Sequence, residues 1–132
     1  MTLTSFYPVI CTDDVHRSAA FYQRWFGFEP TFVSDWYVSL RRGPGVELAF
    51  LDHAHDTIPA GHRSPVAGTI LTFEVDDVDG EYERIVREGG QRPALDIRDE
   101  EFGQRHFILV GPDDVLIDVI TPIPASGEYA AQ

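Results

Sequence analysis

The chain has 132 residues, a length typical of one compact domain, since about 100–200 residues usually form a single one. Hydrophobic residues make up 43% and charged residues 24%, which excludes a disordered or low-complexity chain. Ten Lys and Arg against 22 Asp and Glu give a net charge of −12. This charge repels phosphate backbones, so nucleic acid is not an expected partner. It is compatible with a cationic ligand, although acidity also serves simply to keep a protein in solution.

Membrane and secretion signals are not apparent in the sequence. No apolar run reaches the about 18–20 residues that a membrane-spanning helix needs, and residues 1–5 lack the basic-then-apolar order of a secretory signal. We therefore expect a cytoplasmic protein with no membrane partner. The single cysteine, Cys11, cannot form an intrachain disulfide and is expected to be a small buried apolar side chain.

The first half of the chain begins with a predicted strand at residues 6–12. Asp13 and Asp14 then offer side-chain oxygens that can cap a helix. Apolar residues at spacings of four, three and four form one face of that helix: Val15, Ala19, Tyr22 and Phe26. Gly27 is expected to end the helix in the left-handed conformation. Three strands follow, separated by turn residues, at 29–34, 37–42 and 46–51.

Residues 53–66 show no hydrophobic period and are predicted to form a connecting loop. The loop carries His53, His55 and His62. In an extended chain His53 and His55 would share a face, as a zinc-binding pair does, but no fixed scaffold is apparent and solvated side chains are expected.

The second half repeats the pattern of the first. A strand at 69–75 leads to Asp76-Asp77-Val78, which restates Asp13-Asp14-Val15 of the first half. The helix that follows ends at Gly89-Gly90, and Gly90 follows Gly27 by the same interval that separates the two Asp-Asp-Val segments. Three more strands are predicted at 91–98, 105–110 and 115–120.

The repeat predicts an α+β fold of two βαβββ modules in a pseudo-symmetric arrangement. The modules cover residues of about 5–52 and about 67–122 within one domain, followed by a C-terminal tail at 123–132. Each module is too small to close a core alone and leaves a concave sheet surface open. We therefore expect a homodimer that completes a cavity.

The repeat resembles the vicinal-oxygen-chelate superfamily of glyoxalases, extradiol dioxygenases and bleomycin-resistance proteins. Several segments look most like the bleomycin-resistance, antibiotic-binding branch: Tyr7-Pro8-Val9, Thr12 to Val15, Ala20-Phe21-Tyr22, Gly27-Phe28, Phe32-Val33, Glu101 to Phe107 and Pro112-Asp113. The resemblance covers residues of about 6–122. It leaves open whether the first strand is exchanged between subunits.

The resemblance also implies where a metal would bind. Metal enzymes of the superfamily place one His or Glu ligand on each of the first, fourth, fifth and eighth strands. At those positions this chain has Tyr7, Glu47, Ile70 and Asp118. Ile70 has no donor atom and Tyr7 is a poor ligand for a divalent ion, so neither a metal nor another cofactor is expected.

Glu47 and Asp118 then need another explanation. They would meet a cationic ligand, an Arg of the partner subunit or water. Alternatively, a register shift of one residue would turn both carboxylates to solvent. They could also act as an acid–base pair in an enzyme without a metal.

Aromatic residues form the rest of the expected ligand site. In the resembled resistance proteins an aromatic pair and an aromatic-Gly step line a groove at the dimer interface and stack on flat drug rings. Such rings suit planar ligands, and cation–π attraction favours a positively charged one. Trp36 and Tyr37 are adjacent and are expected on opposite faces of a strand. The expected ligand-binding residues are Phe32, Trp36, Tyr37, Glu47, Phe50, Phe102, Gly103, Arg105, His106 and Asp118, with no catalytic residue among them.

The functional hypothesis is metal-independent sequestration of a planar, cationic natural-product antibiotic, which would confer resistance. Bleomycin, a mitomycin and an enediyne are candidate ligands. Phe102 stands where a Trp is expected before Gly103, which leaves the identity of the drug open. The alternative is a divergent enzyme of the same fold, a lyase, isomerase or dioxygenase acting on a small molecule.

Overall fold

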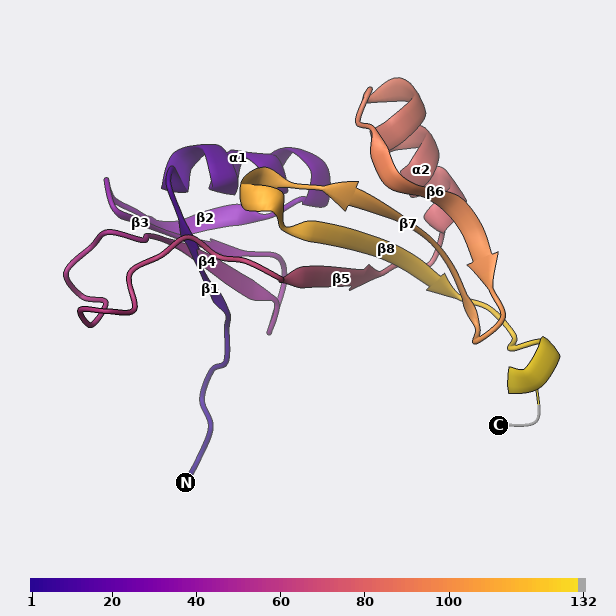
Figure 1. The fold of residues 1–132 in the computed structure, drawn as a ribbon, viewed down its shortest axis with the longest axis horizontal. Helices are drawn as coiled ribbons and strands as arrows, with labels where there is room; N and C mark the ends of the chain where they lie inside the picture. Colours follow the sequence, from indigo (N-terminus) through magenta and orange to yellow (C-terminus); the bar gives the residue numbers. More distant parts are fainter. Residues whose placement is uncertain (131–132) are drawn as a thin grey trace. The chain divides into compact units, whose positions relative to one another are not determined.

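The computed structural model describes residues 1–130 and divides the chain into two units. Unit 1 is Met1–Ala67 and unit 2 is Gly68–Gln132. Each unit has one four-stranded sheet and its own helix (Figure 1). The strand orders are β1-β4-β3-β2 and β5-β8-β7-β6, so the two sheets share one topology. The predicted α+β class with a β-α-β-β-β order in each half is confirmed.

Unit 1 begins its regular structure later than predicted, because the first strand starts at Val9. Its elements are β1 (Val9–Thr12), α1 (Val15–Phe26), β2 (Glu29–Val33), β3 (Tyr37–Arg41) and β4 (Glu47–Asp52). The predicted caps of α1 are confirmed. The Asp14 side chain accepts a hydrogen bond from the Arg17 backbone N–H at 3.1 Å, and Gly27 adopts a φ of +68° that favours glycine.

Helix α1 covers one face of the first sheet (Figure 1). Its apolar side buries Val15, Ala19 and Tyr22, and the Tyr22 ring stacks on Phe50 of β4 with ring centroids 5.3 Å apart. Side chains alternate along a strand, so the neighbours of Phe50 in β4 point away from α1. We call the opposite side the open face of unit 1. It carries Val9, Cys11, Phe32, Tyr37, Ser39, Arg41, Glu47 and Ala49.

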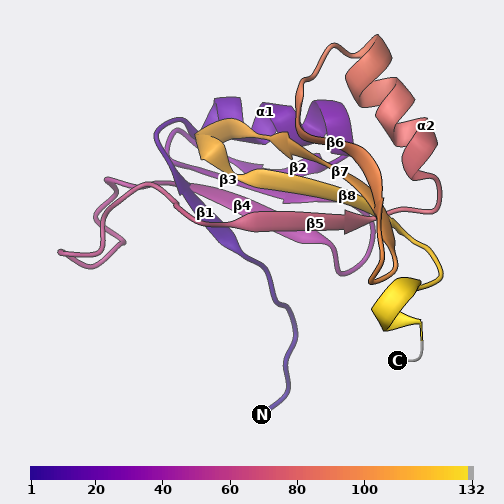
Figure 2. The ribbon, with the colours of Figure 1, turned by 45° about the vertical axis from the view of Figure 1, so that its right-hand side comes forward.

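Unit 2 repeats this plan with a different helix. Its elements are β5 (Ile70–Glu74), α2 (Val78–Tyr82), β6 (Pro93–Glu100), β7 (Gln104–Val110) and β8 (Leu116–Pro122). The chain continues from α2 into a π-helical segment, Glu83–Glu88, where a single α-helix was predicted. Figure 2 shows this helical segment, which precedes β6 along the chain. Short 3-10 turns lie at Pro112–Asp114 and Gly127–Tyr129.

The helix of unit 2 also covers one face of its sheet. Tyr82 packs edge-on against Phe107 of β7 at 5.3 Å, and Ile85 is fully buried. The open face of unit 2, on the other side of the sheet, carries Ile70, Thr72, His106, Ile108, Leu116 and Asp118. Among residues 1–130, no helix has the length and apolar character needed to cross a membrane.

Candidate functional site

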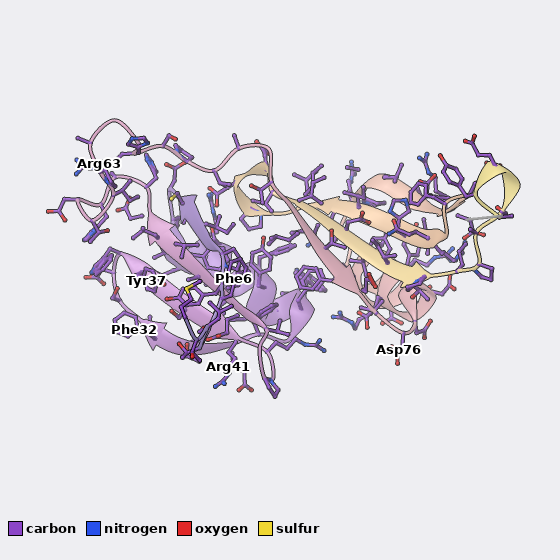
Figure 3. The ribbon with its side chains drawn as sticks, turned by 90° about the horizontal axis from the view of Figure 1, so that it is seen from below. Phe6, Phe32, Tyr37, Arg41, Arg63 and Asp76 are labelled. Carbon is purple, nitrogen blue, oxygen red and sulfur yellow. The ribbon has the colours of Figure 1, made fainter. Side chains whose placement is uncertain are left out.

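A strip of aromatic rings runs along the open face of unit 1. Phe32 and Tyr37 have ring centroids 6.2 Å apart, and the Tyr37 and Trp36 rings are 5.8 Å apart. Phe32 is 54% exposed and Trp36 37% exposed. Figure 3 shows Phe32, Tyr37 and Arg41 on this unit. The strip offers apolar ring surface to a flat ligand.

Trp36 and Tyr37 therefore belong to the same strip, contrary to the expectation that they face opposite sides. The reason is local. Trp36 lies in the bend before β3 and not in the strand, so strict alternation does not apply to it. The bend is held by Ser34, whose hydroxyl accepts the backbone N–H of Tyr37 at 3.0 Å.

A small polar hollow lies in the same sheet. It has a volume of about 120 Å³ and is lined by, among others, Tyr7, Thr31, Ser39 and Glu47. Drug-sized ligands usually fill roughly 300–1,000 Å³, so this hollow accepts one small group of a ligand and not a whole molecule. Burial raises the pKa of Tyr37, whose hydroxyl lies in hydrogen-bond contact with Ser39 and Tyr7. The Tyr37 hydroxyl therefore stays neutral at ordinary pH.

Glu47 is the charged group of this hollow. Its Oε2 accepts a hydrogen bond from the Ser5 hydroxyl at 3.1 Å. In the part of the chain that the structure describes, no Lys, Arg or His forms an ion pair with Glu47. A carboxylate that is half-buried and lacks a cationic partner favours the approach of a positively charged group.

Two histidines hold the loop after β4, and one of them contacts the aromatic strip. The His53 Nε2 lies 2.7 Å from Oδ1 of Asp13, just before α1. The imidazole of His55 stacks on the Trp36 ring at 3.9 Å with an interplanar angle of 7°. His62 is exposed. The loop is thus held at two points, by His53 to the segment before α1 and by His55 to the Trp36 ring.

The open face of unit 2 carries a cluster of a different kind, in which His106 bridges two carboxylates. Its Nδ1 lies 2.8 Å from Oδ1 of Asp118, and its Nε2 lies 2.7 Å from Oε2 of Glu100. The same Glu100 oxygen accepts a hydrogen bond from Nε of Arg98 at 2.7 Å. The His106 side chain is only 7% exposed. Two carboxylates and two cations leave this cluster neutral as a whole.

The charge state of His106 follows from its partners. An ionised carboxylate can only accept hydrogen bonds, so with Glu100 and Asp118 both ionised the two ring nitrogens donate and the ring is an imidazolium. Burial lowers the pKa of His106, but its hydrogen bonds to Glu100 and Asp118 outweigh burial and raise the pKa overall. The hydrogen bonds from His106 and Arg98 hold the pKa of Glu100 below its usual value.

The residues at the implied metal positions do not fit a metal ion. Tyr7 precedes β1 and Glu47 begins β4, whereas Ile70 of β5 pairs with Leu116 of β8. Asp118 pairs with Thr72, two residues further along β8, and its Oδ1 already contacts His106. At the paired positions of β5 and β8, unit 2 therefore has the aliphatic side chains of Ile70 and Leu116. Within residues 1–130, no group of three or more His, Cys, Asp or Glu is arranged to hold a metal.

The structure contradicts one of the expected ligand-binding residues. Phe50 is only 1% exposed, because its position in β4 faces α1 and its ring stacks on Tyr22. It belongs to the core of unit 1 and cannot touch a ligand on the open face.

The expected residues around the turn between β6 and β7 are spread over different surroundings. Arg105 forms ion pairs with Asp79 and Asp99, on the helix side of the sheet and not beside His106. Phe102 packs edge-on against Tyr129 at 6.2 Å and is half exposed. Gly103 has a φ of +111°, and a Cβ there would lie 3.0 Å from the Ile123 carbonyl oxygen. Ligand contact by Phe102, Gly103 and Arg105 stays a prediction.

Two residues of the site were missed by sequence reasoning. The sequence predicts a strand that ends at Arg98, which would put Glu100 in a turn, whereas β6 extends to Glu100. Extending both strands of this hairpin would have placed Glu100 within reach of His106 across the ladder. The sequence carries no corresponding signal for His55, because the loop has no hydrophobic period that would predict its contact with Trp36.

The sequence matches the Glyoxalase/Bleomycin resistance protein/Dioxygenase superfamily over residues 5–119. This chain belongs to that superfamily. A comparison with curated proteins found no match.

Several solved structures share the fold of this chain. A glyoxalase/bleomycin resistance protein/dioxygenase from Nocardioides has a TM-score of 0.75 at 20% identity, over 97% of this chain and 89% of that one. A lactoylglutathione lyase from Agrobacterium tumefaciens has a TM-score of 0.71 at 18% identity, over 92% and 96%. A family enzyme from Burkholderia phytofirmans has a TM-score of 0.74 at 22% identity, over 89% and 97%. At such identities the likeness shows the fold alone.

The His106 cluster predicts a defined dependence of stability on pH. A raised pKa means that the stabilisation by His106 is complete below the unfolded value of about 6.5 and is lost as pH rises through the folded value. The lowered pKa of Glu100 means that its contribution is lost as pH falls through its folded value. At pH values between the folded pKa of Glu100 and that of His106, His106→Gln should lower the free energy of unfolding by roughly 1–3 kcal/mol.

The measurement is urea denaturation from about pH 4.5 to pH 9. The difference between wild type and His106→Gln should shrink toward alkaline pH. His62→Gln changes an exposed histidine in the same way and should leave the unfolding curves unchanged. A difference that grew with rising pH would contradict an imidazolium at position 106.

Proposed function

We propose that this protein binds a flat, aromatic, cationic small molecule on the open face of unit 1 and holds it without chemical change. In this proposal the ligand is a natural-product antibiotic of the bleomycin, mitomycin or enediyne kind, and its capture confers resistance. No metal takes part. The protein acts as a homodimer, which agrees with one sheet face in each unit being left without a helix.

The observation that carries the proposal is the exposed aromatic strip beside Glu47, which is the ladder partner of Arg41 but forms no ion pair with it. The Phe32, Tyr37 and Trp36 rings offer stacking surface, and the hollow at Glu47 has room for one small group. A ligand with a flat ring system and an ammonium or guanidinium group matches both features, because each feature satisfies one part of it.

The distribution of charge supports Glu47 over Asp118 as the counter-charge. Asp118 was expected to share this role, but it already faces the imidazolium of His106. The Glu47 carboxylate accepts a hydrogen bond from the neutral Ser5 hydroxyl and therefore gains more from a cation. The overall charge of −12 adds long-range attraction for such a ligand.

The direct test is a fluorescence titration of the protein with metal-free bleomycin, a mitomycin and an enediyne chromophore at two salt concentrations. A ligand on the strip should quench Trp36 saturably at one molecule per chain. Binding of a cation should weaken at high salt, because added ions screen its attraction to the acidic face. Absence of saturable quenching with every ligand would contradict sequestration.

The aromatic strip can be tested by a matched pair of variants on β2. Phe32→Ala should weaken binding about three- to tenfold, the contribution expected of one stacked ring. Val33→Ala truncates a neighbouring exposed residue that pairs with Val38, on the other side of the sheet. It should bind as wild type does. Equal losses in both variants would show that general loosening of β2, and not ring contact, causes the effect.

The second candidate function is an enzyme of the same fold. It is favoured by the His106 cluster, since a buried histidine between carboxylates occurs in acid–base catalysis. However, both ring nitrogens already have partners, so His106 has no free position for a proton from a substrate. Metal analysis bears on the same choice, because a stoichiometric, chelator-sensitive divalent ion in the purified protein would contradict metal-free capture.

Glu47→Gln separates the two functions. If Glu47 is a counter-charge, the variant should bind a cationic ligand about two- to fivefold more weakly and with less salt dependence. If Glu47 is the base of an enzyme, turnover of the ligand should be abolished. Glu88→Gln, an exposed position in unit 2, removes the same charge elsewhere and should behave as wild type in the titration and in product analysis.

A further inference from the structure

The contact between Trp36 and His55 has the geometry of a ligand stacked on a tryptophan. The two rings are nearly parallel at 7°, and their centroids are 3.9 Å apart. The other ring pairs of the aromatic strip are tilted by 56° and 58°. Trp36 thus has one face covered by a flat nitrogen heterocycle that the chain itself supplies.

The covering ring is held in its orientation from within its own loop. Nδ1 of His55 accepts the backbone N–H of Thr57 at 3.2 Å and lies 2.9 Å from the Thr57 hydroxyl. The same nitrogen lies 3.7 Å from Oδ1 of Asp56, also in the loop. The loop has a separate anchor, the contact of His53 with Asp13. Displacement of the His55 ring from Trp36 therefore costs its contacts with Thr57, whereas the anchor of the loop at His53 does not depend on that ring.

We propose that the face of Trp36 covered by His55 is the subsite for a flat nitrogen-containing aromatic ring of the ligand, and that His55 is displaced when the ligand binds. The position continues the line of rings from Phe32 through Tyr37, so a ligand of several rings would extend along the strip to this point. His55 then lowers the affinity of the protein for all flat ligands. A ligand that stacks on Trp36 too weakly to displace the His55 ring is excluded. This inference rests on the proposed function for the class of ligand.

His55→Ala tests the proposal with proflavine, a flat cationic dye, as the probe. Removal of the competing ring should tighten proflavine binding about three- to tenfold, since a stacked ring pair contributes on that scale. Thr57→Val removes one hydroxyl that holds the imidazole and should shift affinity in the same direction by less. His62→Ala removes an exposed histidine of the same loop and should match wild type.

A second probe makes the subsite testable apart from antibiotic capture. Benzimidazole should quench Trp36 saturably in His55→Ala, because it fills the vacated place, and only weakly in wild type. Loss of this signal in the His55→Ala, Trp36→Phe double variant identifies Trp36 as its source, since Trp25 is buried in the core.

The outcomes separate the two proposals. Unchanged or weaker proflavine binding by His55→Ala, together with no benzimidazole signal, would overturn the subsite. His55 would then either contact the ligand itself or have no effect on binding. If no flat cation binds either protein but benzimidazole saturates His55→Ala, the subsite is supported and sequestration fails. Binding of bleomycin by wild type with no effect of His55→Ala would support sequestration and overturn the subsite.

Discussion

The stacking of Tyr22 in α1 on Phe50 in β4 fixes which side of the first sheet is closed. Because strand side chains alternate, this one contact places Leu48 and Phe50 under the helix and turns Glu47 and Ala49 to the other side. Every open-face group of unit 1 depends on that choice. A shift of one residue in β4 would bury a carboxylate and expose a core ring, so the register is strongly determined.

The two units have the same topology but differ in how the carboxylates on their open faces are satisfied. In unit 2 the open face holds carboxylates, but His106 and Arg98 neutralise them and satisfy their hydrogen bonds. Such a cluster gains little from a further cation. In unit 1 the partner of Glu47 is a neutral hydroxyl, and the carboxylate lies in a hollow beside exposed rings. This asymmetry is the main physical argument for placing ligand recognition on unit 1.

The superfamily assignment constrains the chemistry less than it constrains the fold. One solved structure with this fold, 18% identical in sequence, is described as a lactoylglutathione lyase. In this chain Ile70 and Leu116 lie where donor atoms would be required in unit 2. A site must be argued from its own side chains, because one fold supports several functions. The side chains present here favour stacking and charge recognition.

Much of the fold was determined by the sequence itself, because its signals are local. The cap at Asp14, the left-handed Gly27 and the spacing of Val15, Ala19, Tyr22 and Phe26 each act within one helical turn or two. The repeat of Asp-Asp-Val and of the helix-ending glycine predicted that both halves would share one topology. The aromatic character of Phe32, Trp36 and Tyr37 could also be recognised from composition and position.

Other features were decided only by tertiary structure, because they depend on pairing between distant residues. The burial of Phe50 follows from the side of the sheet on which α1 lies. The imidazolium of His106 required β6 to extend to Glu100 and β8 to bring Asp118 alongside. The covering of Trp36 by His55 arises where a loop without any period meets a bend, so no local pattern encodes it. Sequence periodicity determines which side chains share one face of a helix or strand, whereas long-range packing determines which of them come into contact.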